Sequence, residues 1–217
     1  MFKQIYKIVN ELFFPTHCIH CRARGKILCC NCERFCRAPE RDLPKNIFAL
    51  YDYRDPHIRK ILWAIKYENK YSFASIFGEP LYNLISDILI NDYLILDQNI
   101  ILIPIPVSEK RKKERGYNQA LVLAKEIMKN QKNNKIQILD ILVKEKNTER
   151  QAKIKNRATR LKNVVGSMNI KKDILIPNGT IILIDDITTT GATFREAIRA
   201  LKPITKNHTI ICVAVAH

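Results

Sequence analysis

Short runs of β-branched and other apolar residues alternate along the chain with stretches whose apolar positions recur at helical spacing. Such runs predict strands buried on both faces, and the stretches between them predict the covering helices. The pattern therefore predicts an α/β fold in which a mostly parallel sheet is flanked by helices. Strands are expected at residues 47–53, 100–105, 136–143, 180–184 and 209–216, and helices at residues 58–65, 71–90, 118–130 and 193–202.

Two parts of this pattern are less regular. Gly78 and Pro80 interrupt the second helical stretch, which we expect to form two pieces. Residues 144–165 have weak periodicity and many charges, so a loop and an exposed helix both remain open there.

The first 14 residues predict a short amphipathic helix that packs on the rest of the protein, with membrane contact as the alternative. Lys3, Lys7 and Glu11 break up the apolar positions, and no small-residue cleavage site follows. No run approaches the roughly 18 apolar residues that span a bilayer. We therefore expect no secretory signal. The apolar positions at helical spacing are Phe2, Ile5, Val9, Leu12 and Phe13.

Cysteine usage divides the chain into two unequal parts. The chain has 217 residues, 47% of them hydrophobic, which allows one ordinary domain and a small appendage. Six of its seven cysteines lie between Cys18 and Cys36. A polar stretch with two prolines, residues 38–45, follows. We expect a small module at residues 1–44 and the α/β domain at residues 45–217.

The cysteine pattern predicts a structural zinc site. Cys18 with Cys21 and Cys29 with Cys32 form two C-x2-C pairs, which can present four thiolates to a tetrahedral ion. A module of this size has little core of its own, so metal binding would supply folding free energy. Disulfides are the alternative, but nothing in the chain indicates export. The short gap between the pairs leaves the ligand set open to Cys30, Cys36, His17 or His20.

Two acidic residues and a threonine-rich turn follow the predicted strand at residues 180–184. Asp185 and Asp186 come directly after the strand, at its carboxyl end, where open α/β sheets bind ligands. The turn leads into a predicted helix, whose first N–H groups and nearby hydroxyls suit a phosphate. Because two carboxylates would repel that phosphate, we expect them to meet ribose hydroxyls, with or without Mg²⁺. The expected phosphate-binding residues are Thr188, Thr189, Thr190, Gly191, Ala192 and Thr193.

An alternative is a solvated acidic pair followed by Thr193 as an ordinary helix N-cap. The segment IILIDDITTTGATF, however, resembles the phosphoribosyl pyrophosphate signature of type I phosphoribosyltransferases. The resemblance implies that Asp185 and Asp186 bind the ribose and that residues 188–193 bind the 5-phosphate. Lys66 is a further candidate that could reach the pyrophosphate, and the alternative is a lysine that only extends its ammonium into solvent.

The excess of positive charge predicts polyanionic partners. The net charge is +16, and residues 109–163 hold 17 Lys or Arg against 6 Asp or Glu. Cations interleaved with an aromatic side chain suit single-stranded nucleic acid, through phosphate contacts and base stacking. A solvated charge run is the alternative for any single lysine, and the basic stretch at residues 150–162 adds charge without an aromatic. The candidate nucleic-acid-binding residues are Lys110, Arg111, Lys112, Lys113, Arg115 and Tyr117.

Taken in order, five segments of the chain resemble the ComF family of competence proteins. They are FFPTHCIHC with LCCNC, LWAIKYENK, PIPVSEKRKKERGYNQ, Gln151 with RATRLKN, and the IILIDDITTTGATF segment. The resemblance implies a zinc finger joined to a phosphoribosyltransferase fold. It also implies a cytoplasmic factor that handles single-stranded DNA during natural transformation, together with DNA-uptake machinery or a helicase at the inner membrane.

Three functions follow from these features. The first is a competence factor that binds single-stranded DNA and phosphoribosyl pyrophosphate. The second is an active phosphoribosyltransferase, for which no segment identifies a nucleophile or a catalytic residue. The third is a regulator that binds duplex DNA through the zinc module.

Overall fold

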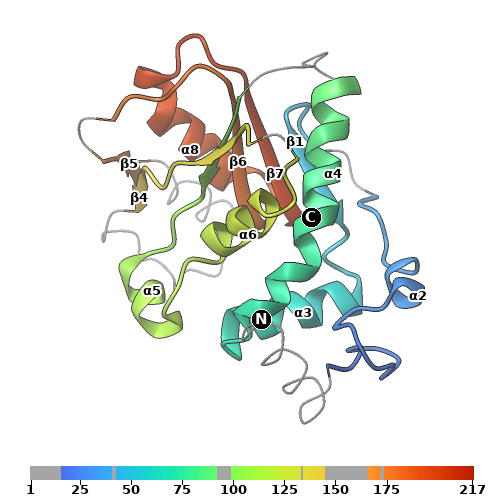
Figure 1. Ribbon diagram of the computed structural model, residues 1–217. Coiled ribbons are helices and arrows are strands. Elements are labelled where there is room, and N and C mark those ends of the chain that lie inside the picture. Colours follow the sequence, from blue (N-terminus) through green and yellow to red (C-terminus); the bar gives the residue numbers. More distant parts are fainter. Residues whose placement is uncertain (1–15, 41–42, 92–98, 133, 145–165, 172–173) are drawn as a thin grey trace, which may run out of the picture.

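The sheet of the protein is parallel, as predicted from the sequence. The computed structural model describes residues 16–40, 43–91, 99–132, 134–144, 166–171 and 174–217. Five strands lie in the order β1-β7-β6-β2-β3, and each neighbouring pair is parallel (Figure 1). Their bounds are β1 Ile47–Tyr51, β2 Ile100–Pro104, β3 Ile136–Ile138, β6 Thr180–Ile187 and β7 Ile210–Ala216.

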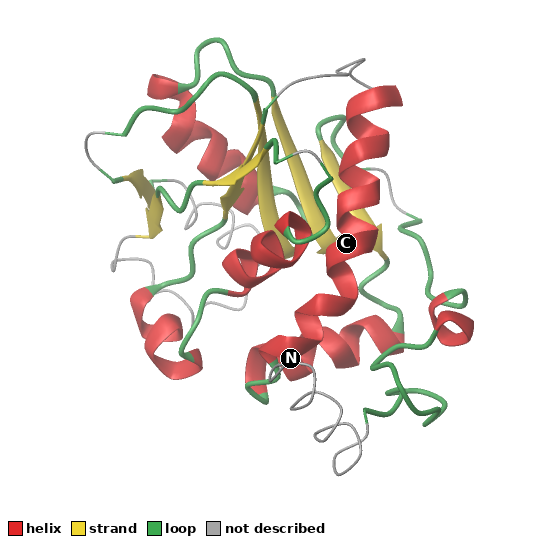
Figure 2. Cartoon of the chain, viewed as in Figure 1, coloured by secondary structure: helices red, strands yellow, loops and turns green. Residues whose placement is uncertain are grey.

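Helices cover both faces of this sheet (Figure 2). Alternate residues of a strand point to opposite faces. Accordingly, Ile182 and Ile184 of β6 belong to the apolar cluster formed with α3, α4 and α6, whereas Ile181 and Leu183 pack with α8. The helices on these faces are α3 Pro56–Tyr67, η1 Tyr71–Ala74, α4 Ser75–Asn91, α6 Gln119–Met128, α8 Ala192–Leu201 and η3 Lys202–Ile204.

The single strand expected at residues 136–143 was a wrong prediction. Only β3 joins the main sheet, and the chain then forms β4 (Leu142–Lys144), which pairs antiparallel with β5 (Met168–Ile170). The buried Glu196 carboxylate of α8 holds β5 in place by accepting the Met168 N–H at 3.1 Å. An apolar run does not reveal that its two halves pair with different partners, so periodicity could not show this break.

The helix expected to break at Gly78 and Pro80 is continuous from residue 75 to residue 91. A Cβ at residue 78 would lie 2.8 Å from the carbonyl oxygen of Glu126 in α6. Gly78 therefore serves close helix packing rather than a break. Two short helices were not predicted: α2 (Cys30–Glu33) and α5 (Glu109–Arg115).

The cysteine-rich segment packs against the start of α3. The Asp55 carboxylate accepts the N–H groups of His57 and Ile58 and thereby caps α3, and it also accepts the Arg37 N–H at 3.2 Å. Tyr51 donates to Glu33 at 3.2 Å, and Cys18 belongs to the same buried cluster as α3. The segment is therefore fixed to the edge of the sheet domain by polar and apolar contacts.

No helix in the described ranges combines the length and the apolar character that a membrane crossing requires. The amphipathic helix expected in the first 14 residues lies outside the described residues, as does most of the segment left open at residues 144–165.

Candidate functional site

The sheet has a topological switch point between β2 and β6. From β2 the chain passes through α6 to β3 on one side, and from β6 it passes through α8 to β7 on the other side. Crevices outside the carboxyl ends of strands at such a point are the usual ligand sites of open α/β sheets. The segments that leave β2 and β6 carry the two groups of candidate residues predicted from the sequence, so the fold brings both groups to one edge.

The acidic pair lies within β6, near its carboxyl end, rather than after the strand, because β6 continues to Ile187. Asp186 is buried, and its carboxylate pairs with the Lys66 ammonium at the end of α3 at 2.9 Å. Asp185 is partly buried and accepts the backbone N–H of Asp186 at 2.8 Å. The β pleat directs the two carboxylates to different sides of the strand, which gives them different surroundings.

Burial and the neighbouring charge of Asp186 raise the pKa of Asp185 to about 8, against the smaller opposing effects of Lys66 and Lys144. Burial, aided by the charge of Arg111, lowers the pKa of Lys144, whereas Asp185 raises it. Lys144, at the end of β4, therefore belongs to the charged edge. It was missed because nothing in the sequence distinguishes it from the other lysines of the basic region.

The residues of the turn after β6 differ in burial and in structural role. Thr188 is buried, and its N–H donates to the carbonyl of Ala216. Gly191 is the N-cap of α8, so the alternative in which Thr193 caps the helix is wrong. No side chain caps α8, which leaves the N–H groups of its first turn available to an anion.

Gly191 is required by the fold itself. It has a φ of 69°, and a Cβ there would lie 2.5 Å from Cδ1 of Ile47. The guanidinium of Arg195 donates to the Thr190 carbonyl at 2.7 Å and fixes the turn from the helix side. A side chain at position 191 would clash with Ile47, so the structure explains this glycine without a phosphate. That Gly191 admits a phosphate remains a prediction.

The basic stretch after β2 is helix α5, with each of its residues at the surface. Ser108 caps its start by accepting the Arg111 N–H, and Gly116 ends it with a φ of 79°. The candidate cations of α5 are Lys110, Arg111, Lys112, Lys113 and Arg115.

The end of α5 meets the end of α3. The guanidinium carbon of Arg115 lies 5.3 Å from the ring centre of Tyr67, and the Tyr117 hydroxyl donates to the Ile65 carbonyl. A pocket of about 290 Å³ lies between these elements and is lined by Lys66, Tyr67, Arg115 and Tyr117, among others. Lys66 thus connects the acidic pair with the cationic residues. A larger pocket of about 430 Å³ lies at the opposite edge of the sheet, near Asn99 and His208, and contains none of the predicted residues.

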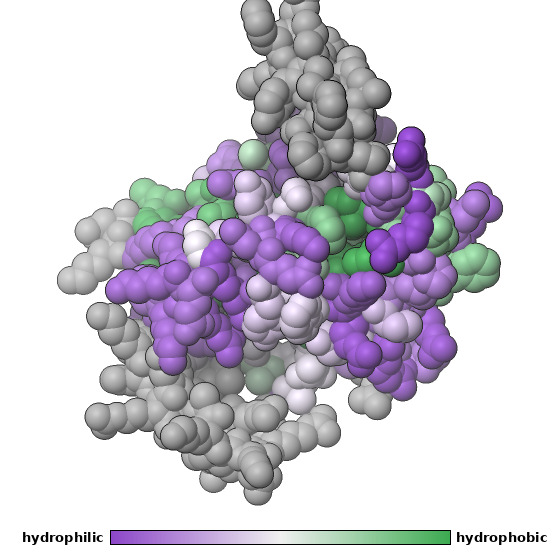
Figure 3. All heavy atoms as spheres, turned by 90° about the horizontal axis from the view of Figure 1, so that it is seen from below, coloured by the Kyte–Doolittle hydropathy of each residue, from purple (hydrophilic) through white to green (hydrophobic). Residues whose placement is uncertain are grey.

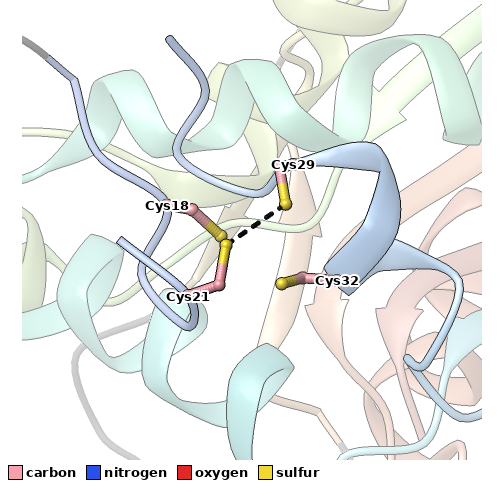
Figure 4. A group of neighbouring side chains, drawn as sticks. All are labelled: Cys18, Cys21, Cys29 and Cys32. Carbon is pink, nitrogen blue, oxygen red and sulfur yellow. Dashed lines mark hydrogen bonds between the residues drawn. The ribbon is translucent and has the colours of Figure 1, made fainter. Parts of the chain in front are cut away.

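The four predicted zinc ligands converge (Figure 4). The Sγ atoms of Cys18, Cys21, Cys29 and Cys32 lie within 4.8 Å of one another, and those of Cys21 and Cys29 are 3.5 Å apart. A tetrahedral zinc with Zn–S bonds of ~2.3 Å places its sulfur atoms about 3.8 Å apart. The four cysteines therefore have the chemistry and the spacing to hold such an ion.

The alternative ligands lie apart from this group. In the described part of the chain, these four cysteines are the one set of three or more potential metal ligands that converge. Cys30 is exposed and accepts from Lys26, and Cys36 donates to the Cys32 carbonyl. His20 contacts His57 of α3, with 2.7 Å between the ring nitrogens.

The pKa values of Cys18 and Cys32 are shifted in opposite directions. Burial opposes ionisation of Cys18, but the backbone N–H groups of Cys29, Cys21 and His20 outweigh it and lower the pKa to about 6. Burial and the neighbouring thiols raise the pKa of Cys32 to about 12. A metal cation would favour the thiolate at every one of these positions.

Comparisons with known proteins identify competence proteins as relatives. Over 219 aligned residues, the chain is 26% identical to Competence protein F of Haemophilus influenzae, which covers 88% of this chain and 93% of that protein. It is 35% identical over 105 residues to Competence protein ComFC of Bacillus subtilis, which covers 48% of this chain and 39% of that protein. No protein-family model matches the chain.

Proposed function

We propose that this chain, a relative of the ComF-family competence proteins, binds single-stranded DNA and phosphoribosyl pyrophosphate at one edge of its sheet during natural transformation. The relatives support a competence role, and the two ligands are our finer proposal. The observation that carries it is the position of Lys66, which pairs with Asp186 on one side and lines the pocket beside Arg115 and Tyr117 on the other.

The sugar phosphate would lie across the carboxyl ends of β6 and β2. Its 5-phosphate would accept from the uncapped first turn of α8, and its ribose hydroxyls would donate to Asp185 and Asp186. The pyrophosphate would take the Lys66 ammonium from Asp186, which frees that carboxylate for the ribose. The site would thus exchange the ion pair between Lys66 and Asp186 for an ion pair of Lys66 with the pyrophosphate and a hydrogen bond of Asp186 with the ribose.

Single-stranded DNA would lie along α5 and the end of α3. Four cations of α5 are exposed on a capped helix, so a phosphate chain can reach several of them at once, and Arg115 is partly buried at the end of the helix. The face seen in Figure 3, at the lower end of Figure 1 where α5 and α3 lie, is largely hydrophilic outside its grey atoms. Such a surface suits a nucleic acid backbone better than an apolar partner.

Two metals belong to this proposal. Zn²⁺ held by Cys18, Cys21, Cys29 and Cys32 would stabilise the module that packs on α3. Mg²⁺ would neutralise charge on the bound pyrophosphate. The two carboxylates Asp185 and Asp186 can supply only part of its coordination shell, so most of its ligands would come from the substrate and water.

The remaining expectations also stay proposals. We place the boundary between the zinc module and the phosphoribosyltransferase-like domain at residues 44 and 45. We further propose that the protein works in the cytoplasm, at the inner surface of the membrane, beside DNA-uptake machinery or a helicase.

Calorimetry with phosphoribosyl pyrophosphate tests the sugar-phosphate site. We expect the double variant Asp185→Asn, Asp186→Asn to bind at least about tenfold more weakly, because Asp186 loses its charge and the residue at position 185 can no longer ionise when the ligand binds. Asp140→Asn, which removes an exposed carboxylate paired with Lys171, should bind like the wild type. Equal affinity of the double variant and the wild type would refute the site.

Oligonucleotide binding tests the second site. Replacing Lys110, Arg111, Lys112 and Lys113 with Ala should reduce the salt dependence of the affinity for single-stranded DNA by a slope of about 3. The control variant Lys202→Ala, Lys206→Ala removes exposed cations that follow α8 at the other edge of the sheet. Tighter binding of duplex than of single strands would favour a duplex-binding regulator instead.

One observation favours the alternative of an active phosphoribosyltransferase. A pocket of about 300 Å³ beside the acidic edge is lined by Lys112, Tyr117 and Lys144, among others, and could admit an acceptor. Release of pyrophosphate from phosphoribosyl pyrophosphate in the presence of a panel of nucleobases would establish transfer.

A further inference from the structure

Four aromatic side chains gather at the surface beside the Lys66 pocket. Trp63 and Tyr67 come from the end of α3, Tyr71 begins η1, and Tyr117 follows α5. The exposed fractions of Trp63, Tyr67 and Tyr71 are 52%, 62% and 57%. We refer to these four residues, with Arg115, as the aromatic platform.

The rings of the platform form two contacting pairs. The ring centres of Trp63 and Tyr67 are 5.5 Å apart, and those of Tyr71 and Tyr117 are 5.7 Å apart. The guanidinium of Arg115 lies over Tyr67, and one ring of each pair, Tyr67 and Tyr117, lines the same pocket as Arg115. The hydroxyl of Tyr117 donates to the Ile65 carbonyl, which fixes the direction of its ring.

The packing of α3 does not require these rings. The buried side of α3 consists of Ile58, Ile61, Leu62, Ala64 and Ile65, whereas Trp63 and Tyr67 lie one helical turn apart on the exposed side. An amphipathic helix normally carries charged residues there, as α3 does at Arg59 and Lys60. Large apolar side chains that lie together on a surface typically mark a binding site, whereas single scattered ones do not.

The chemistry of the platform selects a nucleobase as its ligand. Its apolar surface is aromatic, and its rings lie near three cations: Arg115 over Tyr67, Lys66 in the same pocket, and Lys112, which lines a second pocket with Tyr117. Flat π faces beside cations fit bases attached to phosphates. Aromatic and arginine side chains also occur in protein interfaces. The described residues that line this pocket, however, include no aliphatic side chain, and the net positive charge of the chain favours a ligand that carries phosphates.

We propose that the aromatic platform stacks successive bases of single-stranded nucleic acid while α5 holds the phosphates, with Trp63 and Tyr67 as the principal stacking residues. This inference rests on the proposed binding of single-stranded DNA and deepens it. The α5 cations would provide affinity for any phosphate chain, and the platform would add affinity that depends on the presence of bases.

Trp63 is the single tryptophan of the chain, so its fluorescence reports directly on this surface. Oligo-dT and an abasic oligonucleotide of equal length share their phosphates and differ in their bases. We expect oligo-dT to quench Trp63 and to bind about fivefold to a hundredfold more tightly than the abasic strand, which should leave the fluorescence nearly unchanged.

Variants separate stacking from charge. Because both rings are more than half exposed, Trp63→Ala with Tyr67→Ala should fold normally and bind the two strands, followed by anisotropy of a labelled strand, with equal affinity. Trp63→Phe should keep most of the preference, and Leu175→Ala, at a site 94% exposed, should keep all of it. The α5 variant should weaken binding of both strands alike.

Three results would overturn this inference. Equal affinity of the wild type for oligo-dT and the abasic strand would remove stacking and leave the proposed DNA binding intact. Retention of the full preference for oligo-dT by Trp63→Ala with Tyr67→Ala would show that these rings do not stack on the bases. Quenching of Trp63 by anionic lipid vesicles but by neither strand would assign the surface to a membrane, and only the absence of any anisotropy change for both strands would refute the DNA-binding proposal as well.

Discussion

The carboxyl of Asp185 should make the stability of the protein fall as pH rises. Its pKa is about 8 in the folded protein, against 3.8 for an unperturbed Asp. At a pH between these two pKa values, the folded state therefore retains a proton that the unfolded state has released. This contribution to stability is fully present below the unfolded pKa and is lost as pH rises toward the folded pKa.

The magnitude follows from linkage. One retained proton gives a slope of about 1.4 kcal/mol per pH unit, so the loss between about pH 4 and pH 7 is at most ~4 kcal/mol. The coupled charge of Asp186 and the counter-charges of Lys66 and Lys144 share in this titration, so the measured loss should be smaller. Asp52 acts in the opposite direction, because its pairing with Arg54 lowers its pKa to about 2, and its contribution is complete by about pH 4.

The assay is urea denaturation of the ligand-free protein and of Asp185→Asn at several values between about pH 5 and pH 8. The variant has no carboxyl at this position, so its stability should decline less steeply, and the difference between the two proteins should widen with pH. Asp140→Asn serves as the exposed control. If the free energies of unfolding of the wild type and Asp185→Asn changed in parallel with pH, the carboxyl would be solvated, and burial could not raise its pKa.

Further predictions concern three other parts of the molecule. Cys32→Ser should abolish stoichiometric zinc in metal analysis of the purified protein, whereas Cys30→Ser should retain it; the reverse result would exchange their roles. Gly191→Ala should lower the free energy of unfolding by about 1–3 kcal/mol in chemical denaturation, because of the positive φ and the clash with Ile47. Lys66→Met should weaken phosphoribosyl pyrophosphate binding about tenfold or more in calorimetry, and an unchanged affinity would exclude contact with the ligand.

Much of the sheet could be predicted from the sequence because its strands are short and apolar on both faces. β6 is the clearest case, since four buried apolar residues precede Asp185 and mark the carboxyl edge. Helix α5 was missed because the segment EKRKKER has no apolar period. The capping residues Ser108 and Gly116 were the signal in the sequence that could have indicated this helix.

The site itself could be predicted only as separate pieces. The four zinc ligands share a local spacing, so the sequence indicated them and the fold brings them together. The pairing of Lys66 with Asp186, and of Arg115 with Tyr67, joins residues that are distant in the chain. Such pairings follow from how α3, α5 and β6 meet, which no local pattern encodes.

Lys66 and Tyr67 are successive residues at the end of α3, one directed to the acidic pair and the other to Arg115. A shift of this last helical turn toward either neighbour changes the distance to the other. Occupancy of one side would thus alter affinity on the other, and thermodynamic reciprocity makes the factor identical in both directions. A sugar phosphate that weakened the binding of a DNA strand would itself be bound more weakly, by the same factor, in the presence of that strand.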